Sequence, residues 1–224
     1  MKNNILVVAA HPDDEVLGCG GTIARHVASG DRVFVAFLSS GEGSRSPIDA
    51  RATHRQLSMR RALAVFGIAE SDTFIFDYPD NKMDSVPLLE VVKTVENVVR
   101  DIQPKRVYTH FANDLNIDHQ VVSRAVFTAC RPQPNHSVRE IFCFEVLSST
   151  EWAMPTSSPF LPNIFFDITD FLEHKLRALR AYEDEIREFP HTRSLKHIEY
   201  LARHRGSCVG VEAAEAFVLG RWLF

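Results

Sequence analysis

Two short clusters of histidine and carboxylate side chains are the part of this 224-residue sequence best suited to chemistry. The first reads His-Pro-Asp-Asp-Glu over residues 11–15, and the second runs from His110 to His119 and ends in Asn-Ile-Asp-His. Imidazole nitrogens and carboxylate oxygens suit zinc and related divalent ions, and a catalytic zinc site uses three protein ligands with one position left for water. His11, Asp14 and His119 can supply these three ligands.

A second carboxylate in the first cluster leaves a group free for acid-base chemistry. Zinc lowers the pKa of a bound water to about 7, so that a neighbouring carboxylate such as Asp13 can accept its proton. Spacing alone does not tell which of Asp13 and Asp14 is the ligand. Three adjacent acids before a helix also suit an N-terminal cap that the helix dipole favours. Two clusters at strand ends, each with a histidine near an aspartate, favour a shared site over ordinary caps.

An α/β fold is predicted to position these clusters. Short apolar runs alternate with stretches of helical periodicity, which is typical of parallel strands joined by helical crossovers. We expect strands over residues 5–10, 32–38, 73–76, 106–110, 140–146 and 163–168, and helices over residues 16–28, 51–66, 88–102, 119–130, 171–186 and 194–203. Both clusters then follow strand ends. Ligands bind there in an open parallel sheet, so the clusters should face the same crevice.

The remaining stretches are predicted to be connections. The polar, glycine-rich residues 39–49 suit an exposed loop beside the site, and residues 131–162, apart from their strand, suit an irregular connection near the rim. The C-terminal third is expected to be mostly helical. We predict one domain over residues 1–224, because this length suits a single α/β unit with elaborations.

Composition excludes several classes of protein. The chain has 25 Lys and Arg residues against 29 Asp and Glu residues, a net charge of −4, so it lacks the basic field that attracts nucleic acid or anionic lipid. The apolar run at residues 5–10 is too short for a signal peptide, and no stretch approaches the ~18 apolar residues of a transmembrane helix. The four cysteines form no C-x-x-C pair, which favours a reducing, cytoplasmic compartment.

The glycines within residues 18–21 raise the alternative of dinucleotide binding. The pattern G-x-G-x-x-G is incomplete, because Ile23 stands where the third glycine is required. The acids of residues 13–15 would also repel a pyrophosphate at the helix N-terminus that should attract it. The sequence contains no G-x-S-x-G motif, which would indicate a serine nucleophile. A nucleotide cofactor and a serine hydrolase are therefore both disfavoured.

Several of these motifs together resemble the PIG-L/LmbE family of zinc-dependent deacetylases. They are Ala-His-Pro-Asp-Asp-Glu at residues 10–15, Gly-Cys-Gly-Gly at 18–21, Asp-His at 118–119, Arg-Gly-Ser at 205–207 and Ala-Glu-Ala-Phe at 214–217. The resemblance is strongest over residues 1–45 and 105–125, moderate over 185–217 and weak over 130–165. It implies a Rossmann-like, mostly parallel sheet flanked by helices, here with a helical C-terminal elaboration. It also implies metal-dependent removal of acetyl from an N-acetyl amino sugar.

The resemblance also assigns roles to individual residues. His11, Asp14 and His119 would bind Zn²⁺, and Asp13 would be the general base, which resolves the choice that spacing left open. Fe²⁺, Co²⁺ or Mn²⁺ would suit the same ligands. Arg55 lies where the family often places a substrate-binding arginine, and its planar fork would suit sugar hydroxyls or a phosphate.

One position departs from the family pattern. Many members have His-Pro-Asp-His in the second cluster, where the first histidine binds the oxyanion or protonates the leaving amine, whereas this chain has Asn116. Asparagine can donate a hydrogen bond but cannot deliver a proton. We expect His110 to replace the missing acid, with Asp13 returning its proton as the alternative, and Asp118 to orient a metal ligand. Asn116 or His110 would help to bind the oxyanion.

The sequence therefore predicts a zinc-dependent hydrolase that releases acetate from a small N-acetylated sugar or its conjugate. Two alternatives stay open, an amidase of a thiol-sugar conjugate and a non-catalytic, metal-containing binder of a glycan or metabolite. Homo-oligomers occur in the family, and the apolar, helical C-terminus offers an interface. His191, Arg193 and Glu145 are rim candidates for which ordinary surface roles are favoured.

Overall fold

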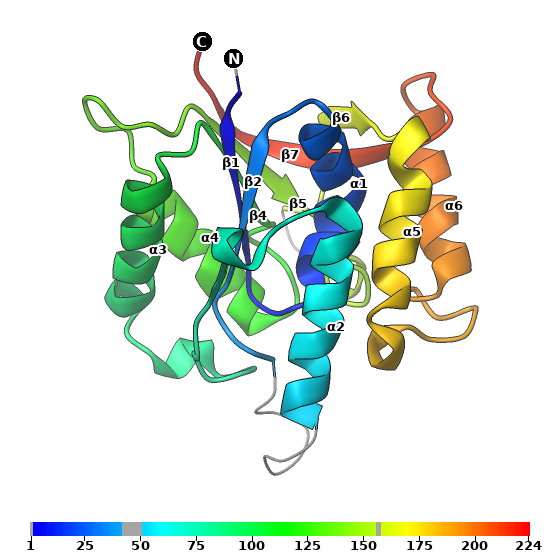
Figure 1. Ribbon diagram of the computed structural model, residues 1–224, viewed down its shortest axis with the longest axis horizontal. Helices are drawn as coiled ribbons and strands as arrows, with labels where there is room; N and C mark the ends of the chain where they lie inside the picture. Colours follow the sequence, from blue (N-terminus) through cyan, green and yellow to red (C-terminus); the bar gives the residue numbers. More distant parts are fainter. Residues whose placement is uncertain (1, 42–50, 156–157) are drawn as a thin grey trace.

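The computed structural model describes residues 2–41, 51–155 and 158–224, and it contains one seven-stranded sheet between two layers of helices (Figure 1). Most of the loop predicted over residues 39–49 lies outside the described residues. The strands are β1 (Asn4–Ala9), β2 (Arg32–Phe37), β3 (Thr73–Ile75), β4 (Arg106–His110), β5 (Glu140–Phe144), β6 (Ile164–Asp167) and β7 (Ala214–Trp222). The helices are α1 (Asp14–Ala28), α2 (Arg51–Phe66), α3 (Leu88–Ile102), α4 (Ile117–Ala129), α5 (Leu172–Arg180) and α6 (Leu195–Ser207).

The strand order places β1 at the centre of the parallel part of the sheet. The order is β3-β2-β1-β4-β5-β7-β6, and Val7 pairs with Val35 of β2 on one side and Tyr108 of β4 on the other. Residues 5–10 are buried, as expected for an apolar strand covered on both faces. The chain turns to opposite sides of the sheet after β1 and after β4, and such a reversal is where ligands bind in this architecture. The predicted mostly parallel α/β fold is confirmed.

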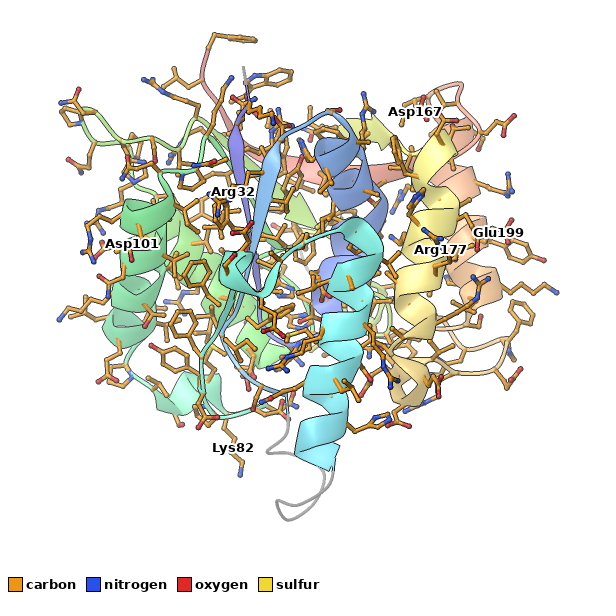
Figure 2. The ribbon with its side chains drawn as sticks, in the orientation of Figure 1. Arg32, Lys82, Asp101, Asp167, Arg177 and Glu199 are labelled. Atoms are coloured by element: carbon orange, nitrogen blue, oxygen red, sulfur yellow. The ribbon has the colours of Figure 1, made fainter. Side chains whose placement is uncertain are left out.

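The helices cover the two faces of the sheet unequally. Helices α3 and α4 pack on one face, while α1, α2, α5 and α6 lie on the other (Figure 1). In α3, Val91, Val95, Val98 and Ile102 are buried at helical spacing against the sheet. Charged side chains such as Asp101 of α3 extend outward from the molecule (Figure 2). Among the described residues, no helix has both the length and the apolar composition needed to cross a membrane.

The C-terminal third differs from the sequence-based prediction in two ways. The helix expected over residues 171–186 ends at Arg180, because the next residues turn to bury Tyr182 and Glu185. A long strand, β7, was not predicted at all, and it pairs antiparallel with β5 and β6 inside the sheet. Its alanines, glutamate and glycine have low strand propensity, so pairing with two neighbours overrides the local preference.

β7 also supports the helix that follows β1. Glu215 is buried, and its two carboxylate oxygens accept the backbone N–H groups of Gly21 and Thr22 at 3.0 and 2.7 Å. Helix α1 is broken at Cys19, whose φ of −147° is not helical, so these N–H groups have lost their helical acceptors. Lys175 of α5 pairs with Glu215 at 2.6 Å and donates to the carbonyl of Leu17. Strand β7 thus stabilises the element that carries the first cluster.

Candidate active site

The two histidine and carboxylate clusters meet at the carboxyl ends of β1 and β4, as predicted. Asp14 opens α1, and its Oδ2 lies 3.4 Å from His11 Nδ1 and 3.3 Å from His119 Nε2. One ligand atom from each of these three buried residues lies within 4.8 Å of the other two. Bonds of about 2.0–2.1 Å to zinc give a tetrahedron with edges of about 3.3 Å. The donor set and its spacing therefore fit a divalent metal ion.

Neighbouring carboxylates fix which nitrogen of each histidine faces Asp14. His11 Nε2 lies 2.9 Å from Asp118 Oδ2 and 3.2 Å from Asp80 Oδ1, which leaves Nδ1 for a metal. His119 presents Nε2, since its Nδ1 lies 3.1 Å from Asp114 Oδ1. A carboxylate behind the imidazole of a metal ligand sets the tautomer and raises the basicity of the ring. His11, Asp80 and Asp118 also have metal-ligand spacing, but these acids contact the nitrogen of His11 that points away from Asp14.

The cluster carries more negative than positive charge when its histidines are neutral. Burial alone would lower the pKa of His11, but hydrogen bonds to Asp118 and Asp14 raise the pKa well above its usual value. The pKa of His119 is raised to about 9, because Asp14 and Asp114 outweigh the effect of burial. Although burial opposes it, the histidines hold the pKa of Asp14 well below its usual value. Such a site favours a bound cation.

His110 lies beneath this cluster. Its Nε2 accepts the backbone N–H of Ala10 at 2.8 Å, and its ring stacks on His119 with a centroid separation of 4.0 Å. Burial and the neighbouring His119 lower the pKa of His110 to about 3, so the ring is neutral. The side chain has no exposed surface and is not among the described residues that line the pocket. Its contacts are those of a support for β1 and His119.

Asp13 is held in an unusual backbone conformation beside the metal ligands. Its φ is +114°, a region that residues with a Cβ rarely adopt. The carboxylate of Glu15 accepts the Asp13 backbone N–H at 2.9 Å and the hydroxyl of Tyr182 at 2.7 Å. Burial raises the pKa of Asp13 to about 6, although Arg193 and Arg55 oppose the rise. The backbone of Asp13 is therefore held by Glu15, a residue outside the three candidate ligands.

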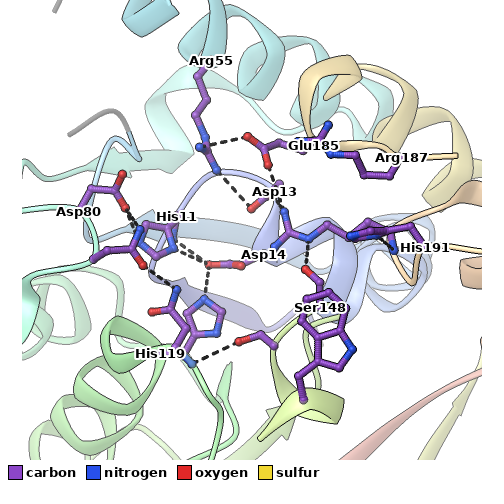
Figure 3. Close-up of a pocket in the computed structure, with 15 residues that line it drawn as sticks. His11, Asp13, Asp14, Arg55, Asp80, His119, Ser148, Glu185, Arg187 and His191 are labelled. Carbon is purple, nitrogen blue, oxygen red and sulfur yellow. Dashed lines mark hydrogen bonds and ion pairs between the residues drawn. The ribbon is translucent and has the colours of Figure 1, made fainter. Parts of the chain in front are cut away.

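Two arginines and Glu185 form an ion-paired frame around Asp13. Arg193 Nη1 donates to Asp13 Oδ2 at 2.9 Å and to Glu185 Oε2 at 3.1 Å. Arg55 lies 3.6 Å from Asp13 Oδ1 and 3.3 Å from Glu185 Oε1 (Figure 3). It also donates to the carbonyls of Pro12 and Gly41. The donors of Arg55 are thus used within the protein, on the turn that carries Asp13, on Gly41 and on Glu185.

A pocket of about 320 Å³ opens onto these groups (Figure 3). Asp80 lies on one side of it and His191 on the other, with Arg55 and Glu185 along a third edge. Asn116 lines the pocket and caps α4, because its Oδ1 accepts the N–H of Asp118 at 2.8 Å. Its Nδ2 donates to Asn81 at 3.0 Å.

The structure also assigns positions that the sequence did not indicate. Asp80, Asp114 and Glu185 were not predicted as site residues, and Arg193 was given an ordinary surface role. Asp114 lies inside the second cluster, so its place before Asn116 was the available signal. Arg193 contacts Asp13 across 180 residues of sequence, and no local pattern reports a contact of that separation. Glu145 pairs with Arg205 at 2.9 Å and does not line this pocket.

The family model described as "PIG-L: GlcNAc-PI de-N-acetylase" matches residues 6–130, and the chain belongs to this family. An uncharacterized deacetylase, YaiS of Escherichia coli strain K12, is 28% identical over 189 residues, which cover 81% of this chain and 91% of that protein. The diacetylchitobiose deacetylase of Thermococcus kodakarensis is 26% identical over 238 residues, covering 98% and 84%. The solved structure of the conserved protein TT1542 from Thermus thermophilus has a TM-score of 0.79 and 26% identity, covering 99% and 96%.

Proposed function

We propose that this protein is a metal-dependent deacetylase that hydrolyses the acetamide of an N-acetyl amino sugar or its conjugate, giving acetate and a free amine. The observation that carries the proposal is the pairing of two adjacent carboxylates in separate environments. Asp14 faces His11 and His119, while Asp13 is held by Arg193 at the same pocket. Relatives named as deacetylases, one of them acting on diacetylchitobiose, support the same reaction.

We assign the metal site to His11, Asp14 and His119, with Zn²⁺ as the first choice and Fe²⁺, Co²⁺ or Mn²⁺ as chemically suitable occupants. A divalent ion bound there supplies a Lewis acid for the amide carbonyl and makes water more acidic. Asp118 and Asp80 orient His11, and Asp114 orients His119, from behind each ring. These carboxylates are positioning residues in this proposal.

Asp13 is the general base in the same proposal. It accepts the proton of the attacking water, while Glu15 holds its backbone N–H and Arg193 holds its carboxylate. Arg55 completes the frame, and its role is to hold the Asp13 turn as well as to meet substrate hydroxyls at the pocket edge. Asn116 lines the pocket and offers an amide N–H for substrate oxygen.

The leaving amine also needs a proton. The contacts of His110 suit a support, so we replace it as the candidate donor with Asp13, which can return the proton it has taken. His191 also lines the pocket, and its Nδ1 accepts the backbone N–H of Arg193 at 3.0 Å. The neutral ring therefore carries its one proton on Nε2, which suits a hydrogen bond to substrate and not proton transfer to the amine.

The presence of Asn116 favours one alternative, a metal-containing protein that binds an acetylated sugar without hydrolysing it. This binder would lack the usual histidine donor, yet would keep the ligand cluster and the pocket. An amidase of a thiol-sugar conjugate would use the same chemistry on another substrate. Measuring the products formed from several substrates distinguishes the three functions, which are deacetylase, binder and amidase.

The test is acetate release from a panel of N-acetylglucosamine derivatives, free, phosphorylated, nucleotide-linked and glycosidic, with a thiol-sugar conjugate included. Zinc-loaded protein should release acetate, and protein treated with a chelator should not. Asp13→Asn should keep the metal and lose about 10²- to 10⁴-fold in turnover, because asparagine tolerates the positive φ but cannot accept the proton. Asp101→Asn, on the outer surface of α3, is the matched control.

Each result decides between the alternatives. Tight binding of a panel member to metal-loaded protein, with no acetate formed, would favour the binder. Release of an acyl group from the thiol-sugar conjugate alone would favour the amidase. Full activity of Asp13→Asn would show that the assignment of the base is wrong.

A further inference from the structure

The pocket wall contains one residue whose chemistry differs from the rest. The described residues that line the pocket carry charged or polar side chains, with the exception of Trp152, whose indole is the one large apolar surface there. Trp152 is 51% exposed. The proposed deacetylation mechanism assigns it no role. A large aromatic surface left open beside a polar pocket suits a ligand that has both hydroxyl groups and a flat apolar face.

The backbone that carries Trp152 is firmly anchored. Trp152 ends a short 3₁₀ helix, Thr150–Trp152, and the hydroxyls of Thr150 and Ser149 both donate to Asp114. The carboxylate of Glu151 accepts the backbone N–H groups of Ser148 and Ser149. The indole is therefore presented by a hydrogen-bonded turn, and a ligand would not have to order it first.

The same contacts fix the indole relative to the catalytic groups. Asp114, which anchors the turn, also lies 3.1 Å from Nδ1 of the candidate ligand His119. On its other side, the Trp152 ring meets His191 edge to face, with centroids 5.6 Å apart and an interplanar angle of 78°. His191 accepts the N–H of Arg193, which binds Asp13. The candidate metal ligand His119 and the proposed base Asp13 are thus each connected to the indole through one or two intervening residues.

The positions of the candidate metal ligands and of Trp152 define the direction in which a bound substrate extends along the pocket. The reacting acetamide has to lie at His11, Asp14 and His119, so the N-acetylated ring occupies the polar part of the pocket. His191 and Ser148 lie across the pocket from Asp80 (Figure 3), and Trp152 contacts His191 on that side. A group attached to the N-acetylated ring and directed toward His191 would reach the indole. The pyranose ring has an axial C–H face that packs on an aromatic ring and hydroxyl edges that bind polar neighbours.

We propose that Trp152 is the platform of a second sugar subsite, on which the pyranose next to the N-acetylated sugar stacks. The proposal rests on the deacetylase function above and specifies its substrate class as an N-acetylated oligosaccharide or glycoside with a neighbouring sugar ring, rather than a free monosaccharide.

A binding experiment can observe this platform directly. The chain has two tryptophans, and Trp222 of β7 is 49% exposed and does not line the pocket, so Trp222→Phe leaves Trp152 as the single indole. In a metal-loaded Asp13→Asn background, N,N'-diacetylchitobiose should shift the Trp152 emission to shorter wavelength in a saturable way. N-acetylglucosamine should give a much smaller shift. The matched protein with Trp152→Phe and Trp222 retained should give no shift with either sugar.

Kinetics provide a second, independent measurement. Trp152→Ala should raise KM for N,N'-diacetylchitobiose about 5- to 10-fold with little change in kcat, because aromatic packing at one ring contributes binding of that size. KM for N-acetylglucosamine should not change. Trp152→Phe should recover most of the loss, and Trp222→Ala should behave as wild type.

Other outcomes would overturn the subsite. Equal KM increases for both sugars, or equal emission shifts for both, would show that the indole does not recognise a second ring. An octyl glycoside of N-acetylglucosamine that binds as tightly as the disaccharide would identify an apolar rather than a sugar subsite. If wild type releases no acetate from any sugar, the proposed function is wrong, and the emission titration alone then decides whether the subsite binds a disaccharide.

Discussion

The ligand cluster and the frame around Asp13 are neighbouring parts of one pocket, but they are built in different ways. The cluster takes His11, Asp14 and His119 from the segments that follow two adjacent strands, β1 and β4, and the sheet topology brings these segments together. The frame brings Arg193 and Glu185 from the C-terminal third to a residue near the N-terminus. In the proposed mechanism, the segments at the strand ends hold the metal, and the later segments hold the carboxylate of the proposed base, Asp13. The two regions should therefore fail in different ways.

The largest effect is expected from His119→Ala. Loss of one of three ligands should remove the bound metal and lower acetate release by more than about 10³-fold, because the polarising cation is lost with it. Metal content per chain and acetate release should be measured on the same preparation. His204→Ala, an exposed histidine of α6, is the matched control. A variant that keeps its metal would show that His119 is not a ligand.

Breaking the frame should lower turnover and leave the metal in place. Arg193→Gln removes the cation that binds both Asp13 and Glu185, so the base should lose its alignment and turnover should fall about 100-fold. The free energy of unfolding should also drop by about 2 kcal/mol, since charge-assisted hydrogen bonds are lost. Arg177→Gln on the outer face of α5 provides the comparison (Figure 2). Loss of metal from Arg193→Gln would argue against separate roles for the two regions.

A more subtle change within the cluster should act on affinity. Asp118 accepts the backbone N–H groups of Asn81 and Met83 and lies 2.9 Å from His11 Nε2. Asp118→Asn weakens the orientation and basicity of His11, so the dissociation constant of the metal should rise about 10- to 100-fold. Turnover at saturating metal should change much less. Competition with a chromophoric chelator measures the affinity, and an unchanged constant would remove Asp118 from the metal site.

The smallest effect is expected far from both regions, at Asp31. Burial would raise the pKa of Asp31, but the N–H of Asn3 and the ring of His26 lower it overall. A carboxylate with a lowered folded-state pKa stabilises the protein above its unfolded pKa of about 4, and this contribution is lost as pH falls through the folded value. Asp31→Asn should reduce the free energy of unfolding by about 1 kcal/mol at pH 6.

Denaturant titrations of wild type and Asp31→Asn should begin to approach each other below about pH 4 and should converge only when pH has fallen through the lowered folded-state pKa of Asp31, because the native carboxyl stays ionised until then. Metal content and turnover should be unaffected. A difference in stability that persists at low pH would mean that the charge of Asp31 is not its source.

The sequence predicted the parallel half of the fold because each element there follows its local pattern. Buried β-branched runs formed β1 and β2, and valines at helical spacing formed α3. β7 was missed because its alanines and glutamate indicate a helix, and only pairing with β5 and β6 makes it a strand. The turn after Arg180 was missed because Tyr182 and Glu185 are buried against Glu15 and Arg55, which are distant in sequence.

The site shows the same division. Metal-ligand types and the convergence of strand ends in a parallel sheet led to His11, His119 and one of the two adjacent aspartates. Only the family resemblance assigned Asp14 as the ligand and Asp13 as the base. The supporting role of His110 could not be predicted, because it follows from a hydrogen bond in which His110 Nε2 accepts the backbone N–H of Ala10, a residue at the end of another strand. Trp152 lies where the family resemblance is weak, so its position in the pocket wall appears only in three dimensions.

The place of β7 in the sheet has a consequence for how the chain is made. This strand lies between β5 and β6, yet it is the last of the seven strands to leave the ribosome. Until then the nascent chain presents the unpaired edge of β5, and the break in α1 lacks the Glu215 carboxylate that satisfies it. Open strand edges promote association between chains. A premature stop before residue 214 should therefore yield aggregated protein and not a shortened enzyme.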